Sequence, residues 1–169
     1  MHKVGDKVVY GTDGVMAVVD IREETVMGEV RRYYVLGELD SRSDSKTFVP
    51  VDNEKLTSLM RPLLSKDEIY AMLDSVKDMS ELPWEGDNKA RIERFRKIIA
   101  SGDRAEMISM IRSIYKSGER REREGRRIFL SDEHIMKKAE KLLHTEISAV
   151  LGIPEADVPA FIEERINGK

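Results

Sequence analysis

The sequence predicts an α+β protein of two domains, a small N-terminal β-barrel over residues 1–60 followed by an all-α helical domain over residues 61–169. Two observations support this prediction. In the first part of the chain apolar and polar residues alternate, as expected for half-buried strands, and glycine and aspartate interrupt the alternation at turns. From Leu63 onward apolar residues recur with a period of about 3.6 residues, which is typical of amphipathic helices. The domain boundary is therefore placed close to Met60–Pro62.

The N-terminal domain is expected to contain four or five short strands. The alternation places them near residues 7–10, 15–21, 31–36 and 46–51, with turns at residues 11–14 and 41–45. This number of short strands fits an SH3-like or Tudor-like barrel. A domain of about 60 residues buries only a modest core, so the barrel would depend on the next helix or on a partner for stability. That dependence favours an interaction module over an enzyme.

The C-terminal domain is expected to contain four helices and a short terminal one, each marked by a capping residue, a glycine or a proline. They are a helix capped by Ser65 and Glu68 and ended by residues 82–86, a helix from about Asn88 to Ser101, a helix capped by Asp103 and Glu106, a helix begun by Ser131 and ended by Gly152, and a terminal helix with Val158, Phe161, Ile162 and Ile166 inward. The third helix is expected to bury Met107, Ile111, Ile114 and Tyr115.

The composition excludes several classes of protein. The chain contains no cysteine, which removes disulfides, thiolate zinc sites and cysteine nucleophiles and favours a reducing compartment. The N-terminus lacks a leader pattern, and no stretch approaches the roughly 20 apolar residues of a membrane-spanning helix, so we expect a cytoplasmic protein without membrane contact. His2, His134 and His144 are too scattered for a metal site, and no phosphate-binding loop or nucleophile motif is present. We expect no metal, no cofactor and no enzymatic activity.

The only tryptophan, Trp84, stands in a break between two predicted helices and is followed by a strongly basic helix. The net charge is -3, yet residues 81–130 contain 13 lysines and arginines against 9 acidic residues. In one interpretation Trp84 is an exposed apolar wedge in the DNA minor groove, beside cations that hold phosphates. In the other it caps the helical core, and the basic face is ordinary solvated surface. The candidate DNA-binding residues are Trp84, Lys89, Arg91, Arg94, Arg96 and Lys97.

A second group of cations lies in the polar run 118–127, where glutamates are interleaved with arginines. Mixed sign weakens the attraction to phosphate, so a solvated connector between the third and fourth helices is favoured, and DNA contact there would be secondary. The cations of this run are Arg120, Arg121, Arg123, Arg126 and Arg127.

Residues 46–51 are a candidate binding edge of the barrel. The segment is strand-like and contains Pro50, which cannot donate a bond to a neighbouring strand. An open edge of this kind can pair with a strand of a partner protein. The alternative is an ordinary strand with Phe48 in the barrel core, and the sequence leaves both interpretations open.

Several short motifs occur together in this chain. In the N-terminal domain they are VGDKVVY at residues 4–10, Gly14 with Val15, YYVL at residues 33–36 and VPV at residues 49–51. In the helical domain they are Trp84, SGD at residues 101–103, and AEKLL at residues 139–143 with Glu146. In combination they resemble the CarD/CdnL regulators of bacterial RNA polymerase over nearly the whole length. The N-terminal domain of that family is Tudor-like and is shared with the transcription-repair coupling factor.

The resemblance implies that the barrel docks on the lobe of the RNA polymerase β subunit by strand pairing. It also implies that the helical domain reaches promoter DNA at the upstream edge of the bubble, typically at ribosomal RNA promoters, with Trp84 as the wedge that stabilises the open complex. Some relatives have arginine at the positions of Glu24 and Phe48, so docking here would use other groups. The candidate polymerase-binding residues are Arg22, Glu24, Arg31, Thr47, Phe48 and Val49.

The sequence thus predicts a monomeric, non-enzymatic transcription regulator that binds RNA polymerase and promoter DNA with little base-specific readout. The alternative is a protein-interaction adaptor whose barrel docks a partner without DNA contact. In that case the helical bundle is scaffold and Trp84 is buried, so the exposure of Trp84 distinguishes the two.

Overall fold

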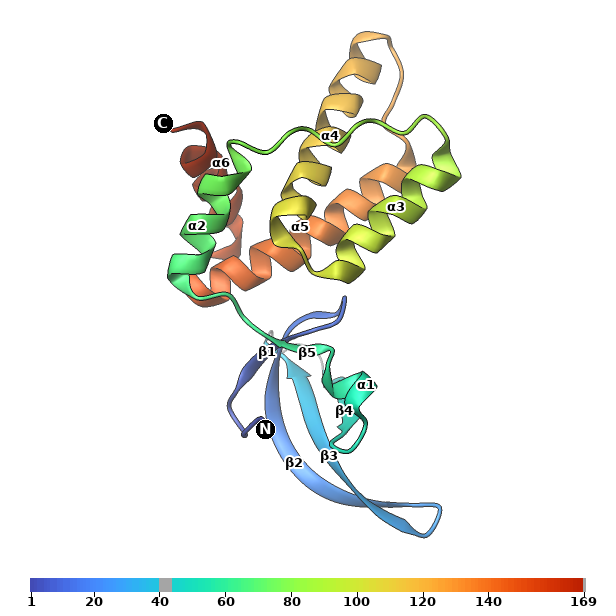
Figure 1. Ribbon diagram of the computed structural model, residues 1–169, viewed down its shortest axis with the longest axis vertical. Helices are drawn as coiled ribbons and strands as arrows, with labels where there is room; N and C mark the ends of the chain where they lie inside the picture. The colour runs from blue at the N-terminus through green and yellow to red at the C-terminus, as the bar shows by residue number, and fades with distance from the viewer. Residues whose placement is uncertain (40–43, 169) are drawn as a thin grey trace. The chain divides into compact units, whose positions relative to one another are not determined.

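The computed structural model describes residues 1–39 and 44–168, and the chain divides into two compact units, Met1–Leu63 and Leu64–Lys169. The first unit contains the strands and the second contains the long helices (Figure 1). The division lies after residue 63 rather than residue 60, because Met60–Pro62 form a strand that pairs with the first strand of the sheet.

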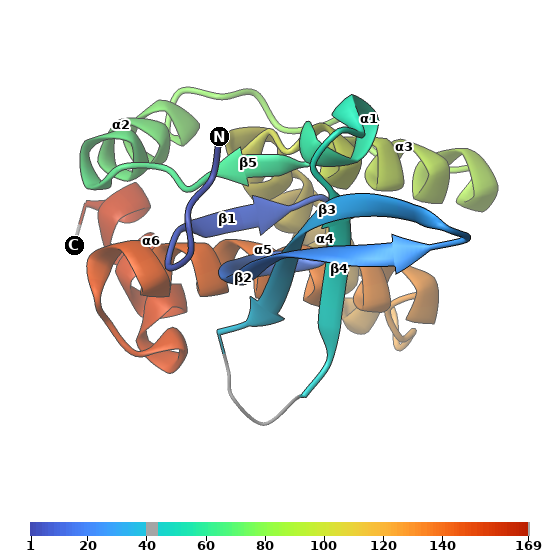
Figure 2. The same ribbon diagram turned by 90° about the horizontal axis from the view of Figure 1, so that it is seen from below.

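The N-terminal unit is an antiparallel sheet with the strand order β4-β3-β2-β1-β5 (Figure 2). Its elements are β1 (Lys7–Tyr10), β2 (Gly14–Val26), β3 (Glu29–Glu38), β4 (Lys46–Pro50), the short helix α1 (Glu54–Thr57) and β5 (Met60–Pro62). The four predicted strands and the turn at residues 11–14 are therefore present. Since β4 and β5 are the two ends of the strand order, closure into a barrel stays a prediction.

The β2–β3 hairpin extends beyond the predicted strands. Pairing continues to Val26 opposite Glu29, and the turn between them has positive φ at Met27 (52°) and Gly28 (84°). Positive φ at both central residues gives a two-residue turn the twist of its flanking strands. Side chains in this extension are mostly exposed, so no alternation marks it in the sequence. The turn predicted at residues 41–45 lies largely outside the described residues.

The core of the sheet unit is small, as expected for a domain of this length. Alternate residues of β1, β2 and β3 point to one face, where they pack against residues from β4 and β5. The buried residues of this cluster are Val8, Tyr10, Met16, Val18, Tyr34, Leu36, Val49 and Met60.

The C-terminal unit is helical, and most of the predicted capping signals mark the ends of its helices. Two boundaries are corrected: the first helix ends at Val76, before the predicted break at residues 82–86, and the fourth begins at Leu130 with Phe129 as its N-cap rather than at Ser131. The elements are α2 (Lys66–Val76), α3 (Asn88–Ser101), α4 (Arg104–Arg123), α5 (Leu130–Leu151), the 3-10 helix η1 (Glu155–Asp157) and α6 (Val158–Asn167). Ser65 and Glu68 form the reciprocal capping box at the start of α2, and the Asp103 side chain accepts a hydrogen bond from the Glu106 N–H. Gly102 ends α3 in the left-handed conformation.

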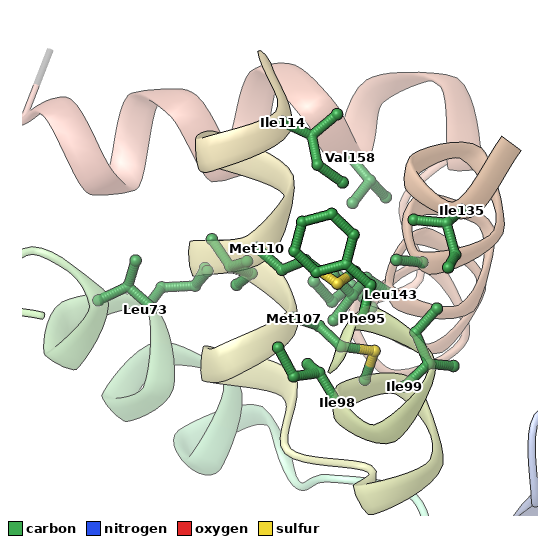
Figure 3. Packing of buried hydrophobic residues seen from close by; sticks show 14 of the residues in the cluster. Leu73, Phe95, Ile98, Ile99, Met107, Met110, Ile114, Ile135, Leu143 and Val158 are labelled. Atoms are coloured by element: carbon green, nitrogen blue, oxygen red, sulfur yellow. The ribbon is translucent and has the colours of Figure 1, made fainter. Parts of the chain in front are cut away.

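Side chains from all five helices of this unit meet in one core (Figure 3). The predicted buried face of α4 needs one correction. Tyr115 is 61% exposed, whereas Met110 is fully buried. The core contacts of α4 follow Met107, Met110 and Ile114, a spacing of three and four residues, which turns Tyr115 toward solvent.

The polar run 118–127 is also corrected. Helix α4 continues to Arg123, so the connector to α5 is limited to residues 124–129. Arginine and glutamate favour the helical conformation, and a helix that extends into solvent needs no apolar stripe in its last turns. Within the described part of the chain, no helix has the length and apolar character needed to cross a membrane.

Candidate functional site

Trp84 lies in the segment between α2 and α3, which crosses α4 in the helical unit (Figure 1). Three contacts hold the segment on α4. Arg112 Nη1 donates to the Val76 carbonyl at 3.3 Å, and Ser113 Oγ donates to the Leu82 carbonyl at 3.2 Å. Lys116 forms an ion pair with Glu81. All three contacts anchor the part of the chain that precedes Trp84.

The Trp84 side chain is half-buried and packs against the edge of the helical core. Its ring lies 6.3 Å from the Phe95 ring, at a tilt of 58°. The guanidinium carbon of Arg91 lies over the ring, 4.7 Å from its centre. This geometry lies between the two sequence interpretations, because the indole is supported by the core and still has accessible surface.

Arg91 was predicted to contact phosphate, but in the structure its side chain is buried. Its side chain is 1% exposed and forms a bidentate ion pair with Asp132, with both N–O distances at 3.0 Å. It also donates to the Glu85 carbonyl at 3.0 Å and to Asn88 Oδ1 at 2.7 Å. The burial removes Arg91 from the cations that can reach a phosphate and makes it a support of the Trp84 segment.

The other predicted cations of α3 fall into two groups. Arg94 is half-buried and donates to the Pro83 carbonyl at 3.0 Å, so it also braces the segment. Lys89, Arg96 and Lys97 are exposed on the outer side of the helix, where Lys97 pairs with Glu93 at 3.4 Å. Only this second group offers charge to a ligand from α3.

Asp132 and Phe129, which complete the Arg91 site, were not candidates in the sequence. The Phe129 ring lies 5.1 Å from the Arg91 guanidinium and 3.9 Å from that of Arg121. An acidic residue in the first turn of a helix has an ordinary explanation in the helix dipole. No local signal therefore marks Asp132 as the partner of an arginine 41 residues away.

The pKa of Glu81, beside Trp84, is lowered because Lys116 donates a hydrogen bond to its carboxylate and because the charges of Lys116 and Arg112 favour the ionised form. Glu81 is therefore an anion at neutral pH. No group of three or more histidines and carboxylates suited to a metal occurs among the residues that the structure describes.

The second candidate surface is β4, an edge strand of the sheet. The Val51 N–H donates to the Arg32 carbonyl, and the antiparallel register places Tyr34 opposite Val49 and Val35 opposite Phe48. Since bonded and non-bonded pairs alternate, Val49 bonds to β3, whereas the N–H and C=O of Phe48 point to the outer edge. Phe48 thus presents its backbone to a partner strand.

The side chains of β4 alternate in the same way. Val49 is fully buried, Thr47 is half-buried and Phe48 is 42% exposed. The Arg22 guanidinium lies 5.0 Å from the centre of the Phe48 ring, and Tyr33 packs edge-on at 6.2 Å. Arg22, Phe48 and the half-buried Tyr33 therefore form one cluster beside the edge, and Tyr33 was not among the candidate polymerase-binding residues.

The charged candidates of this unit are paired within the sheet. Arg22 Nε lies 2.8 Å from a Glu24 carboxylate oxygen, and Arg31 Nη2 lies 2.9 Å from Glu29. All four side chains are well exposed, so a partner can compete for them at little cost.

An edge strand with an outward-facing backbone can pair with a strand of another protein. Residues 2–64 match the family described as CarD-like/TRCF RID domain. The sheet unit is therefore similar to this domain family, which is related to interaction with the β subunit of RNA polymerase. The match confirms the resemblance to the CarD/CdnL family on the N-terminal unit.

Proposed function

We propose that this protein is a non-enzymatic, cytoplasmic transcription regulator that acts as a monomer and stabilises the promoter open complex, typically at ribosomal RNA promoters. The sheet unit docks on the lobe of the RNA polymerase β subunit, and the helical unit contacts DNA at the upstream edge of the bubble. One observation carries the proposal: a RID domain stands on the same chain as a half-exposed tryptophan held in place beside cations.

Docking on polymerase is proposed to use strand pairing at β4. The N–H and C=O of Phe48 supply the outward hydrogen bonds, and the Arg22, Phe48 and Tyr33 side chains supply the contact beside them. Main-chain pairing makes the docking less dependent on side-chain identity. This supports docking even though the arginines of some relatives are replaced by Glu24 and Phe48.

DNA contact is proposed to use the accessible part of Trp84 against the minor groove, where an apolar wedge favours an unstacked step. Lys89, Arg96 and Lys97 add phosphate contacts. A ligand that binds the open state more tightly than the closed state shifts the equilibrium by its difference in affinity, and each tenfold difference corresponds to about 1.4 kcal/mol. The mechanism therefore requires binding and no chemical step.

The wedge is tested by the lifetime of the open complex on a ribosomal RNA promoter. Wild-type protein is expected to lengthen the lifetime, and a folded Trp84→Ala variant that still binds polymerase is expected to lose most of this effect. Tyr115→Ala is the matched control, because Tyr115 is an exposed aromatic residue of the same unit. Equal lifetimes with wild type and Trp84→Ala would contradict the wedge and favour the adaptor function, in which the helical unit is scaffold.

Strand pairing is tested at Phe48 by two substitutions. Phe48→Pro removes the outward N–H and leaves the ladder to β3 intact, because that position does not bond to β3. Phe48→Ala removes the side chain and keeps the N–H. We expect the proline variant to bind polymerase less tightly than the alanine variant, measured by titration with the isolated β lobe. Equal affinities would show that docking uses the side chain alone.

A further inference from the structure

An opening of about 330 Å³ lies beside Trp84 in the helical unit. One wall is the segment that carries Glu81, Pro83 and Trp84, and the other is α4, which contributes Lys116, Ser117 and Arg120. Trp84 and α4 therefore line the same opening. The exposed cations of α3, Lys89, Arg96 and Lys97, do not line this opening.

The charges around the opening favour an anion. Lys116 and Arg120 are one helical turn apart, so both side chains project from the same side of α4. Glu81 is the acidic residue among the described residues that line the opening, and it is paired with Lys116. No ion pair is recorded for Arg120 within the described residues, and its side chain is exposed. The charged residues that line the opening therefore have a net charge of one positive unit, from Lys116 and Arg120 against Glu81.

A duplex is the occupant that fits an indole beside unopposed cations. Duplex DNA carries one phosphate charge per about 1.7 Å of axis, so any duplex that packs on Trp84 places phosphates within reach of neighbouring side chains. On the side of Arg91, the Arg91 side chain is buried and paired with Asp132, and Arg94 donates a hydrogen bond to the Pro83 carbonyl. On the side of the opening the neighbouring side chains are Lys116 and Arg120.

We propose that Trp84, Lys116 and Arg120 form one DNA surface, in which Arg120 binds a backbone phosphate through its fork of N–H donors and Lys116 exchanges Glu81 for a second phosphate. This inference rests on the proposed DNA contact and specifies its backbone partners. It assigns a direct role to Arg120, at the start of the run that the sequence favours as a connector, and adds phosphate contacts on α4 to those proposed for Lys89, Arg96 and Lys97 on α3.

The test compares Arg120→Gln with Arg123→Gln in the complex of polymerase, promoter and full-length protein. Both residues are exposed on the last turns of α4, but Arg123 does not line the opening. With Arg120→Gln the lengthening of the open-complex lifetime is expected to fall several-fold. The slope of log lifetime against log salt is expected to fall by about one. Arg123→Gln is expected to match wild type in both quantities.

Glu81→Gln tests the same surface in the opposite direction. Removal of the carboxylate frees Lys116 for phosphate, so this variant is expected to lengthen the lifetime beyond that of wild type. A purely structural role of the Glu81–Lys116 pair predicts no gain. Circular dichroism of each variant establishes that the helical unit is folded.

The outcomes separate this inference from the proposed function. If Trp84→Ala loses the effect but Arg120→Gln and Glu81→Gln behave as wild type, the α4 surface is overturned and the wedge stands. If wild-type protein leaves the lifetime unchanged, the proposed function fails and this inference fails with it. If an acidic polypeptide at matched charge changes Trp84 fluorescence in the free protein and a promoter duplex does not, the surface binds protein rather than DNA.

Discussion

The sheet unit and the helical unit use their charged residues differently. In the sheet unit the pairs Arg22–Glu24 and Arg31–Glu29 lie on the exposed surface of the strands, with every partner more than 40% exposed. In the helical unit the Arg91–Asp132 pair is buried, with each side chain 1% exposed. Exposed pairs contribute little to stability, whereas a buried pair is costly to break. The charged residues of the first unit are therefore accessible to a partner, whereas in the second unit a charged pair supports the fold.

A second buried carboxylate strengthens this contrast. Glu146 of α5 accepts hydrogen bonds from Arg104 at 2.8 and 3.0 Å and from the Leu64 N–H at 3.0 Å. It joins α5 to the start of α4 and to the first residue of the unit. In both buried sites the charge is met by several hydrogen bonds, which is the condition under which burial is tolerated.

The largest expected effect tests the role of burial directly. The helical unit contains two bidentate Arg–Asp pairs, the buried Arg91–Asp132 and the exposed Arg165–Asp74, whose N–O distances are 2.7 and 2.9 Å. Asp132→Ala is expected to destabilise the unit by about 3–5 kcal/mol, because it leaves Arg91 buried without a counter-ion. Asp74→Ala is expected to change stability little. Chemical denaturation followed by circular dichroism measures both.

Similar losses for the two aspartates would show that burial does not decide the strength of these pairs. Trp84 fluorescence adds a local readout, because Trp84 is the only tryptophan and Arg91 lies over its ring. Asp132→Ala is expected to alter the emission and quenching of Trp84, and Asp74→Ala is expected to leave them unchanged.

The next effect sharpens the contrast within the sheet unit. Val49 and Phe48 are adjacent on β4, one fully buried and the other 42% exposed. Val49→Ala is expected to cost about 2 kcal/mol, because it removes two buried methyl groups and leaves a cavity. Phe48→Ala is expected to change stability much less and to weaken polymerase binding more than its stability loss explains. Thermal denaturation and β-lobe titration of the two variants check this division of roles.

The smallest expected effect concerns pH. Burial lowers the pKa of His144 in α5 below its ordinary value of 6.5, against the opposing pull of Glu140 and Glu155. The unfolded chain then takes up a proton at higher pH than the folded chain, so stability is complete above about pH 6.5 and declines as the pH falls toward the folded-state pKa. His144→Gln is expected to flatten this decline. Denaturant midpoints between pH 7.5 and 5.5 measure it, and an unchanged slope in the variant would contradict the prediction.

Local signals in the sequence were sufficient for most of the element boundaries. Ser65 with Glu68, and Asp103 with Glu106, act over three residues, and Gly102 and Gly152 each take the left-handed conformation that ends a helix. The prediction that Tyr115 is buried was wrong, because the side of α4 that faces the core depends on the elements that pack against it.

The candidate sites also differ in how far neighbouring residues predict them. The edge position of β4 was one of the two sequence interpretations of residues 46–51, and the other, with Phe48 in the core, is wrong because Phe48 is 42% exposed. The burial of Arg91 could not be predicted from neighbouring residues, since the helix that contains it is basic on several sides and its partner Asp132 lies 41 residues away. The opening beside Trp84 depends in the same way on residues from α4.

The sequence by itself determined the two-part organisation, the period of each part, the caps, and the resemblance that residues 2–64 confirm. These properties depend on neighbouring residues, where hydrogen bonds and side-chain periodicity act over a few positions. Only the tertiary structure decided which cations are available to a ligand and which are buried. That choice depends on burial and on counter-ions brought together from distant parts of the chain, and desolvation makes the same arginine either a ligand for phosphate or a part of the core.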